Sequence, residues 1–125
     1  MEPIFIVTAL IFDEKGRCLA VKKHGQEVLI KPGGKREPGE DELQTLLREV
    51  REELGCGLVN LERLGQFEDE AAHQPGRKVE AVVYRATLSG VPTPQNEIEA
   101  LVWVDPKRAE DYPLAKLYRQ VLGGF

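Results

Sequence analysis

The segment from residue 34 to residue 56 constrains the fold most, because a glycine-rich turn leads directly into a strongly patterned helix. It reads GKREPGEDELQTLLREVREELGC. Apolar side chains recur in it at intervals of three and four residues, the period of one helix face. These side chains are Leu43, Leu46, Leu47, Val50 and Leu54. The pattern predicts a helix over residues 41–54 that packs this apolar stripe on a sheet.

Acidic side chains occupy a different face of the same predicted helix. Glu49, Glu52 and Glu53 stand in an i, i+3, i+4 relation, which brings their Cβ atoms to within about 5 to 6 Å of one another. Three carboxylates at this spacing repel one another, but together they can share a hard divalent cation. The preceding turn contains Gly33 and Gly34, and its carbonyls can reach a metal ion while its amides approach phosphate oxygens.

Residues 34–56 resemble the complete Nudix box, the signature of the Nudix hydrolases. The resemblance rests on seven positions, which are Gly34, Glu40, Arg48, Glu49, Glu52, Glu53 and Gly55. At an average usage of roughly 7% per residue type, a chance match in a chain of this length has odds of about one in a million. The one departure is Cys56, where the family usually has an aliphatic residue, and a free cysteine packs as a small hydrophobe.

The resemblance implies a metal-dependent enzyme that hydrolyses a nucleoside diphosphate linked to another group. Phosphoanhydrides react slowly because their anionic oxygens repel nucleophiles, and a divalent metal neutralises that charge and lowers the pKa of a bound water. The implied cofactor is Mg²⁺ or Mn²⁺. Its implied ligands are Glu52, Glu53, the carbonyl of Gly33, and Glu49, which is either a further ligand or the base.

Two further residues of the box, and one glutamate outside it, are expected to support this chemistry. Arg48 is expected to pair with the carboxylates of the box and fix their rotamers, and Glu40 belongs to the same supporting set. Many relatives also recruit a glutamate from the region before the last strand, where this chain offers Glu97 and Glu99. We prefer Glu97 as catalytic residue and metal ligand, because it lies where the loop meets the strand. The alternative is that both glutamates face solvent. The candidate catalytic residues are therefore Arg48, Glu49, Glu52 and Glu97.

Basic side chains near the turn are candidates for substrate binding. Lys31, Lys35 and Arg36 flank it and could hold phosphates. His73 lies in a polar loop that often borders the substrate in related enzymes. Each candidate has an ordinary alternative, because surface lysines near a turn mostly confer solubility and a lone exposed histidine usually has no binding role.

The remaining pattern predicts strands on either side of the helix. Strand-like runs cover residues 3–12, 17–22, 28–31, 58–67, 78–88 and 98–104, and an amphipathic helix closes the chain at 114–122. Residues 13–16 are typical of a hairpin turn between the first two strands. Tyr84 and Trp103 lie in apolar runs and are expected in the core. This order implies the α/β class with a mixed sheet covered on both faces, which fits the Nudix fold, an α/β/α sandwich.

Composition argues against several other classes of protein. With 125 residues, 42% of them hydrophobic, the chain suits a single domain over residues 1–125. A net charge of −4 with intermixed signs argues against an extended nucleic-acid-binding surface. The apolar run at residues 4–12 is too short to span a bilayer and no cationic leader precedes it, so we expect a cytoplasmic protein. Cys18 and Cys56 lack metal-ligand spacing and are expected to be buried thiols.

The box specifies the chemistry and leaves the substrate open. The short chain favours a nucleoside triphosphate pyrophosphohydrolase of the MutT type, because it lacks the extra domain of many sugar-nucleotide hydrolases. A dinucleoside polyphosphate or RNA 5′-end pyrophosphohydrolase is the alternative within the enzyme class. A Nudix domain that senses nucleotides without turnover is the alternative outside it, and the intact glutamates argue against that function. The oligomeric state stays open between monomer and homodimer.

Overall fold

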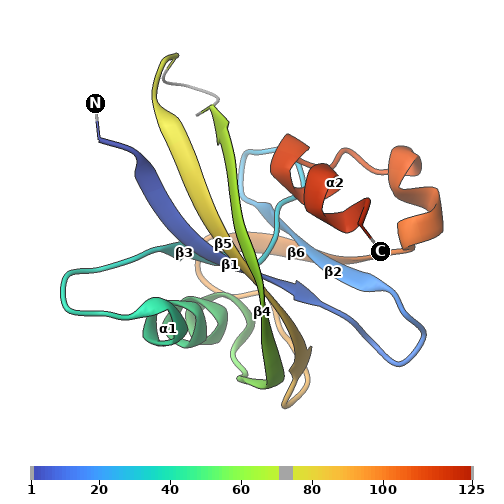
Figure 1. Ribbon diagram of the computed structural model, residues 1–125. Coiled ribbons are helices and arrows are strands. Elements are labelled where there is room, and N and C mark those ends of the chain that lie inside the picture. The colour runs from blue at the N-terminus through green and yellow to red at the C-terminus, as the bar shows by residue number, and fades with distance from the viewer. Residues whose placement is uncertain (1, 71–74, 125) are drawn as a thin grey trace.

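The computed structural model describes residues 2–70 and 75–124, which form two sheets (Figure 1). The strands are β1 (Ile4–Ile11), β2 (Cys18–Lys23), β3 (Gly33–Lys35), β4 (Leu58–Glu70), β5 (Lys78–Leu88) and β6 (Ile98–Val104). The larger sheet has the order β3-β1-β5-β4, and β2 pairs with β6 in the smaller one. β1 runs parallel to β5, whereas the β1–β3 and β4–β5 pairs are antiparallel. The predicted mixed sheet is therefore confirmed.

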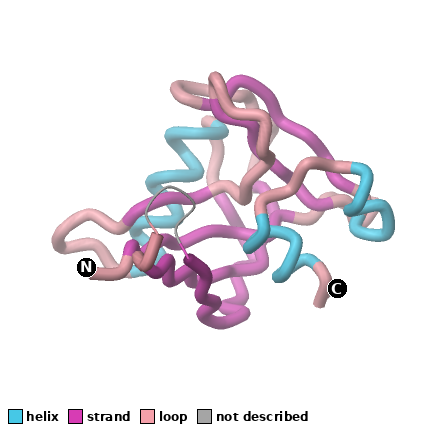
Figure 2. The backbone as a smooth tube through the Cα atoms, turned by 90° about the horizontal axis from the view of Figure 1, so that it is seen from above, coloured by secondary structure: helices cyan, strands magenta, loops and turns pink. Residues whose placement is uncertain are grey.

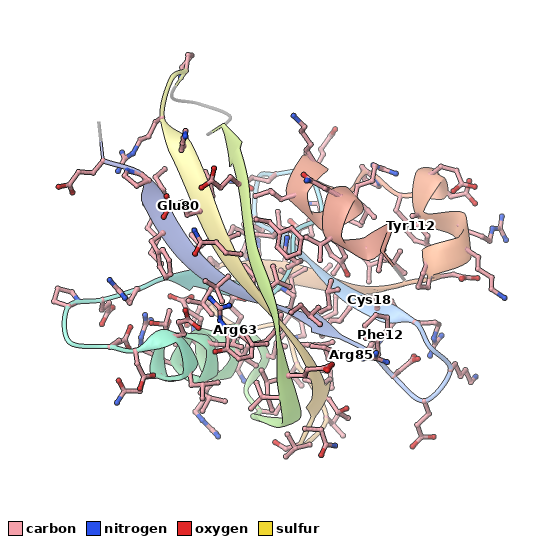
Figure 3. The ribbon with its side chains drawn as sticks, viewed as in Figure 1. Phe12, Cys18, Arg63, Glu80, Arg85 and Tyr112 are labelled. Carbon is pink, nitrogen blue, oxygen red and sulfur yellow. The ribbon has the colours of Figure 1, made fainter. Side chains whose placement is uncertain are left out.

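Helices α1 (Glu42–Leu54) and α2 (Lys116–Leu122) lie on opposite sides of the strands (Figure 1). The view from above shows α2 near the 3₁₀ helix η1 (Pro106–Asp111) and away from α1 (Figure 2). Each α-helix covers its own apolar cluster. Cys18 and Tyr112 belong to the α2 side, whereas Arg63 reaches α1 and pairs with Glu42 at 3.0 Å (Figure 3). Neither α-helix, nor any other helix of the described residues, is long and apolar enough to cross a bilayer.

Local sequence signals set both ends of α1. Asp41 is the N-cap, since its side chain accepts the backbone N–H of Gln44 while the Gln44 side chain accepts the backbone N–H of Asp41. Gly55 ends the helix in the left-handed conformation, with a φ of 70° that glycine adopts without strain. The predicted extent of this helix is therefore confirmed to within one residue.

The apolar stripe of α1 is narrower than predicted. Leu46, Val50 and Leu54 are fully buried. Leu43 and Leu47, by contrast, are 41% and 39% exposed, so the prediction that all five leucine and valine side chains face the core is wrong for these two. The buried face is rotated toward Thr45 and Glu53 instead. This rotation brings a carboxylate into the interior.

The turn at residues 13–16 forms, but the strands that it joins enter different sheets. Asp13 closes the turn by accepting the backbone N–H of Arg17 at 2.8 Å. Beyond it, the described pairing between these chain segments is one bridge, from Phe12 to Cys18, and β2 pairs with β6. The predicted β1–β2 hairpin pairing is therefore wrong, because alternating hydrophobicity specifies a strand but not its neighbour.

The strand predicted at residues 28–31 lies further along the chain. Leu29 and Ile30 form isolated bridges, and the strand itself is β3. Gly33 at its start has a φ of +137°, and a Cβ there would overlap the carbonyl oxygen of Val7. The absence of a side chain thus permits the close approach of β3 to β1.

Most residues predicted to pack in the core are buried. Cys18 and Cys56 are buried free thiols, and burial raises the pKa of Cys18 to about 11. Tyr84 is buried and its hydroxyl donates to Oε1 of Glu42 at 2.9 Å. Trp103 is partly buried and packs against the cluster under α1. The core positions predicted for these residues are confirmed, although Trp103 keeps part of its surface exposed.

Candidate active site

The guanidinium of Arg48 holds the acidic residues of the box together. Its Nε and Nη2 bind the two oxygens of Glu40 at 2.7 and 3.0 Å, and Nη1 donates to Glu49 at 2.9 Å. Nη2 also donates to the carbonyl of Lys35 at 3.1 Å, and Nη1 lies 3.5 Å from the carboxylate of Glu52. Because charge-assisted, bidentate bonds restrict rotation, Arg48 fixes the rotamers of its partners.

This pairing moves two pKa values away from neutrality. Hydrogen bonds from Arg48 lower the pKa of Glu40 to about 2, and the same bonds raise the pKa of Arg48. Glu40 also accepts the hydroxyl of Thr45 at 3.1 Å. Both members of the ion pair are therefore charged throughout the neutral pH range, so the support for Glu49 does not depend on pH there.

Glu53 is the buried carboxylate of the site. The residue is 2% exposed, and burial raises the pKa of its carboxyl group to about 8. The backbone N–H of Gly33 donates to Oε1 at 3.2 Å, which lowers this pKa, whereas the charges of Glu49 and Glu97 raise it. A buried carboxylate surrounded by further carboxylates is stable in its charged form only beside a cation. The donor set of Glu49, Glu53 and Glu97 therefore fits a hard divalent cation.

The glycines of β3 lie directly against these carboxylates. A Cβ at Gly34 would lie 2.6 Å from Oε2 of Glu49, so any larger residue would displace that side chain. Across residues 2–70 and 75–124, no three His, Cys, Asp or Glu side chains already converge as metal ligands do. Arg48 instead lies between Glu49 and Glu52 and binds both.

A cavity of about 450 Å³ adjoins the acidic residues. Glu49 and Glu97 line it together with Gly33, Lys31 and Lys35. This volume lies within the usual range for small-molecule sites. The cavity therefore brings candidate metal ligands and candidate phosphate ligands to one place.

A second cavity, of about 690 Å³, lies at another part of the surface. It is bordered by Phe12, Arg17, Arg85 and Trp103, with the Arg85 guanidinium 5.0 Å from the centroid of the Phe12 ring (Figure 3). None of its described lining residues comes from α1 or β3. The smaller cavity, which Glu49 and Glu97 line, is therefore the candidate active site.

Comparison with known proteins gives the family. The NUDIX domain family model matches residues 3–123. The chain belongs to the Nudix family. The CTP pyrophosphohydrolase of Escherichia coli (strain K12) is 34% identical over 118 residues, which are 87% of this chain and 82% of that protein. This chain is therefore a Nudix pyrophosphohydrolase, and Nudix hydrolases generally use divalent metals.

Solved structures share the Nudix fold over nearly the whole chain. The solution structure of the E. coli ORF135 protein superposes with a TM-score of 0.79 at 31% identity, covering 98% of this chain and 88% of that one. The crystal structure of a MutT NUDIX hydrolase from Burkholderia pseudomallei gives a TM-score of 0.83 at 29% identity, with 98% of each chain covered. The predicted Nudix fold is therefore confirmed.

The glutamates of the Nudix box are not equivalent in the structure. Glu49 lines the cavity and Glu53 is buried beside β3. Glu52 lies on the open side of α1, where 52% of its side chain is exposed, and it does not line the cavity. The structure thus places Glu49 and Glu97 at the cavity and Glu53 in the interior beside β3, whereas Glu52 lies away from the cavity.

Glu97 and Glu99 have different surroundings. Glu97 lines the cavity and lies 3.6 Å from Nζ of Lys23, and its charge acts on Glu53. Glu99 forms an ion pair with Lys22 at 2.7 Å. Of the two glutamates, Glu97 is the one beside the Nudix box.

The loop before β6 is docked on the C-terminal end of α1. The backbone N–H groups of Thr93 and Gln95 donate to the last carbonyls of the helix, and the Asn96 side chain donates to the carbonyl of Glu52 at 2.7 Å. These bonds hold Glu97 near the box. Sequence reasoning missed this contact, because no spacing rule connects the loop with a helix about forty residues earlier. The one local signal in the sequence is Asn96, since asparagine tolerates the left-handed conformation, and its φ in the structure is 53°.

The predicted phosphate ligands differ in exposure. Lys35 is exposed and lines the cavity. Arg36 is exposed too, but its guanidinium lies 5.0 Å from the centroid of the Phe5 ring and does not line the cavity. Lys31 is only 6% exposed, and burial lowers its pKa to about 8, so the alternative of a solubilising surface lysine is wrong for it. His73 lies outside the described residues.

Proposed function

We propose that the chain hydrolyses nucleoside triphosphates to nucleoside monophosphates and pyrophosphate. The observation that carries this proposal is the buried Glu53, which lies with Glu49 and Glu97 beside a cavity lined by lysines. The likeness to a CTP pyrophosphohydrolase supports a nucleotide as the substrate.

The proposed cofactor is Mg²⁺ or Mn²⁺. Glu53 and Glu52 are its proposed principal ligands, with the Gly33 carbonyl and Glu97, and Glu49 is either a further ligand or the base. When bound, the metal would neutralise phosphate charge and lower the pKa of a water molecule. Glu52 would need a different rotamer, and a solvent-exposed side chain can make that change.

The chain's own residues have separate proposed roles. Arg48 orients Glu49 through the 2.9 Å hydrogen bond while its charge stays paired with Glu40. Lys35 and Arg36 are proposed to bind phosphate oxygens, since both are exposed cations, one at the end of β3 and the other directly after it.

A nucleotide panel assayed with and without divalent metal tests this function. We expect release of pyrophosphate from nucleoside triphosphates in Mg²⁺ and none in excess EDTA. Faster turnover of dinucleoside polyphosphates or of RNA 5′ ends would favour the alternative enzymes. Tight nucleotide binding without turnover of any compound would favour a sensor and contradict the proposal.

A further inference from the structure

Lys31 carries a buried ammonium group without a carboxylate partner. Among the described residues, no carboxylate lies within ion-pair distance of it and none accepts a hydrogen bond from it. Neighbouring lysines differ, since Lys22 is paired with Glu99 at 2.7 Å and Lys23 with Glu97 at 3.6 Å. Of these three lysines, Lys31 is therefore the one without a carboxylate partner, and it is buried.

The contact that Lys31 does make leaves its hydrogen-bonding capacity unused. Its Nζ lies 5.5 Å from the centroid of the Tyr118 ring. Tyr118 is fully buried and its hydroxyl donates to the carbonyl of Leu19 at 2.6 Å, so the hydroxyl is already committed. A cation–π contact replaces only part of the hydration that a buried ammonium loses.

Thr8 supplies a second unpartnered donor in the same cavity. Its side chain is buried, and Oγ1 has no hydrogen-bond partner among the described residues. Thr8 lies opposite Gly33 in the β1–β3 ladder, and both Thr8 and Lys31 line the cavity that Glu49 borders. Buried polar groups almost always have partners, because each loses its bonds to water on burial. Oxygen acceptors on a molecule bound in this cavity would supply the partners that both groups lack.

We propose that Lys31 and Thr8 recognise an oxygen acceptor on the nucleobase, and that they select bases bearing a carbonyl oxygen over adenine. Adenine lacks an exocyclic oxygen, whereas guanine, hypoxanthine and the pyrimidines each carry at least one. The cavity lining also includes Ile6 and Leu117, whose apolar side chains suit the faces of a base. This inference rests on the proposed function, since a nucleotide must occupy the cavity.

The position of Lys31 separates it from the phosphate ligands. Tyr118 belongs to the apolar cluster under α2, on the opposite side of the strands from α1 (Figure 1). The candidate metal ligands Glu49 and Glu53 belong to α1, and the metal has to lie beside the phosphates that it activates. Lys31 therefore faces the part of the substrate that lies beyond the phosphates, which revises the phosphate role predicted for it from the sequence.

Binding of two nucleoside monophosphates tests the inference without turnover. Inosine and adenosine 5′-monophosphates differ in an oxo group against an amino group at carbon 6 of the base. Calorimetry in Mg²⁺ is expected to give the wild-type protein at least about tenfold tighter binding of the inosine compound, the effect of a charge-assisted hydrogen bond.

Three variants locate the preference. Lys31→Met removes the ammonium group and keeps an unbranched apolar side chain of similar size, and we expect the ratio of the two dissociation constants to fall to within about threefold. Thr8→Val keeps the shape and removes the hydroxyl, so an intermediate ratio is expected. Lys35→Met is the matched control, because it removes another ammonium of the cavity lining and should leave the ratio unchanged. Circular dichroism and a cooperative melt verify folding, and Thr8→Val tests the subsite independently of Lys31→Met.

The outcomes separate this inference from the proposed function. Equal affinities for both monophosphates in the wild type would overturn the inference, and so would an equal loss of both in Lys31→Met, which would assign Lys31 to phosphates. A wild-type protein that prefers the inosine compound through Lys31 but hydrolyses no nucleotide would support the inference and contradict the proposed function. Hydrolysis of nucleoside triphosphates by a protein that shows no preference between the two monophosphates would support the proposed function and contradict the inference.

Discussion

Glu53 is a carboxylate that the fold keeps in its interior at an energetic disadvantage. Its pKa, about 8 in the folded protein, lies above the ordinary value of 4.5 because of burial and the charges of Glu49 and Glu97. Between these two pH values the folded state binds one more proton than the unfolded state. The free energy of unfolding of the metal-free protein therefore falls as pH rises through this window, and this destabilisation is complete above the folded pKa.

Glu53→Gln is expected to remove that pH dependence and to abolish most of the activity. The neutral amide needs no proton, so the difference in denaturant midpoint between variant and wild type, measured in EDTA, should increase from pH 5 to pH 8 in favour of the variant. We expect kcat to fall by about 10² to 10⁴ because a proposed metal ligand is lost. Parallel pH profiles for the two proteins would show that Glu53 titrates normally.

A second residue-scale prediction concerns the loop before β6. Glu97→Gln is expected to lower kcat at least about tenfold, because Glu97 lines the cavity and its charge reaches Glu53. Glu99→Gln is the matched control, since Glu99 is paired with Lys22 and is expected to change kcat by less than about threefold. Steady-state kinetics at saturating Mg²⁺ decide between them, and a crippled Glu99→Gln enzyme would reverse the assignment.

At the scale of elements, α1 carries the site on one face and packs on the strands with another. Leu46→Ala is expected to lower the free energy of unfolding by about 2 to 5 kcal/mol, because Leu46 is fully buried in the cluster under the helix. Leu43→Ala provides the control, since Leu43 is exposed and should change it by less than about 0.5 kcal/mol. Urea denaturation measures both, and similar losses in the two variants would mean that the helix is rotated in solution.

How far sequence predicts these elements depends on how local the signals are. Helix α1 is predictable because its cap, stripe and glutamates all lie within one segment. β3 is not, since two of its three residues are glycines, which have low strand propensity. The β2–β6 pairing joins segments about eighty residues apart, and no pattern within either strand specifies its partner. For the same reason the positions of the box glutamates on α1 can be predicted from the sequence, whereas the burial of Lys31 cannot.

At the scale of the whole molecule, the proposed metal would stabilise the folded state. A ligand that binds only the folded protein raises its melting temperature by mass action. We therefore expect Mg²⁺ or Mn²⁺ to raise the wild-type melting temperature relative to EDTA, as measured by scanning calorimetry. Glu53→Gln should show a much smaller shift, and an equal shift in both proteins would place the ions elsewhere.

The hydrogen bonding of residues 93–96 to α1 affects which mutations can change substrate specificity in this enzyme. The hydrogen bonds from Thr93, Gln95 and Asn96 make the acidic wall of the cavity a single unit with the helix. Another part of the cavity lining, with Lys31 and Leu117, lies on the α2 side of the strands, where Lys31 contacts the Tyr118 ring. Substitutions in that part of the lining leave the hydrogen bonds between residues 93–96 and α1 in place. Base specificity can therefore change by mutation without moving the acidic residues that the proposed hydrolysis needs.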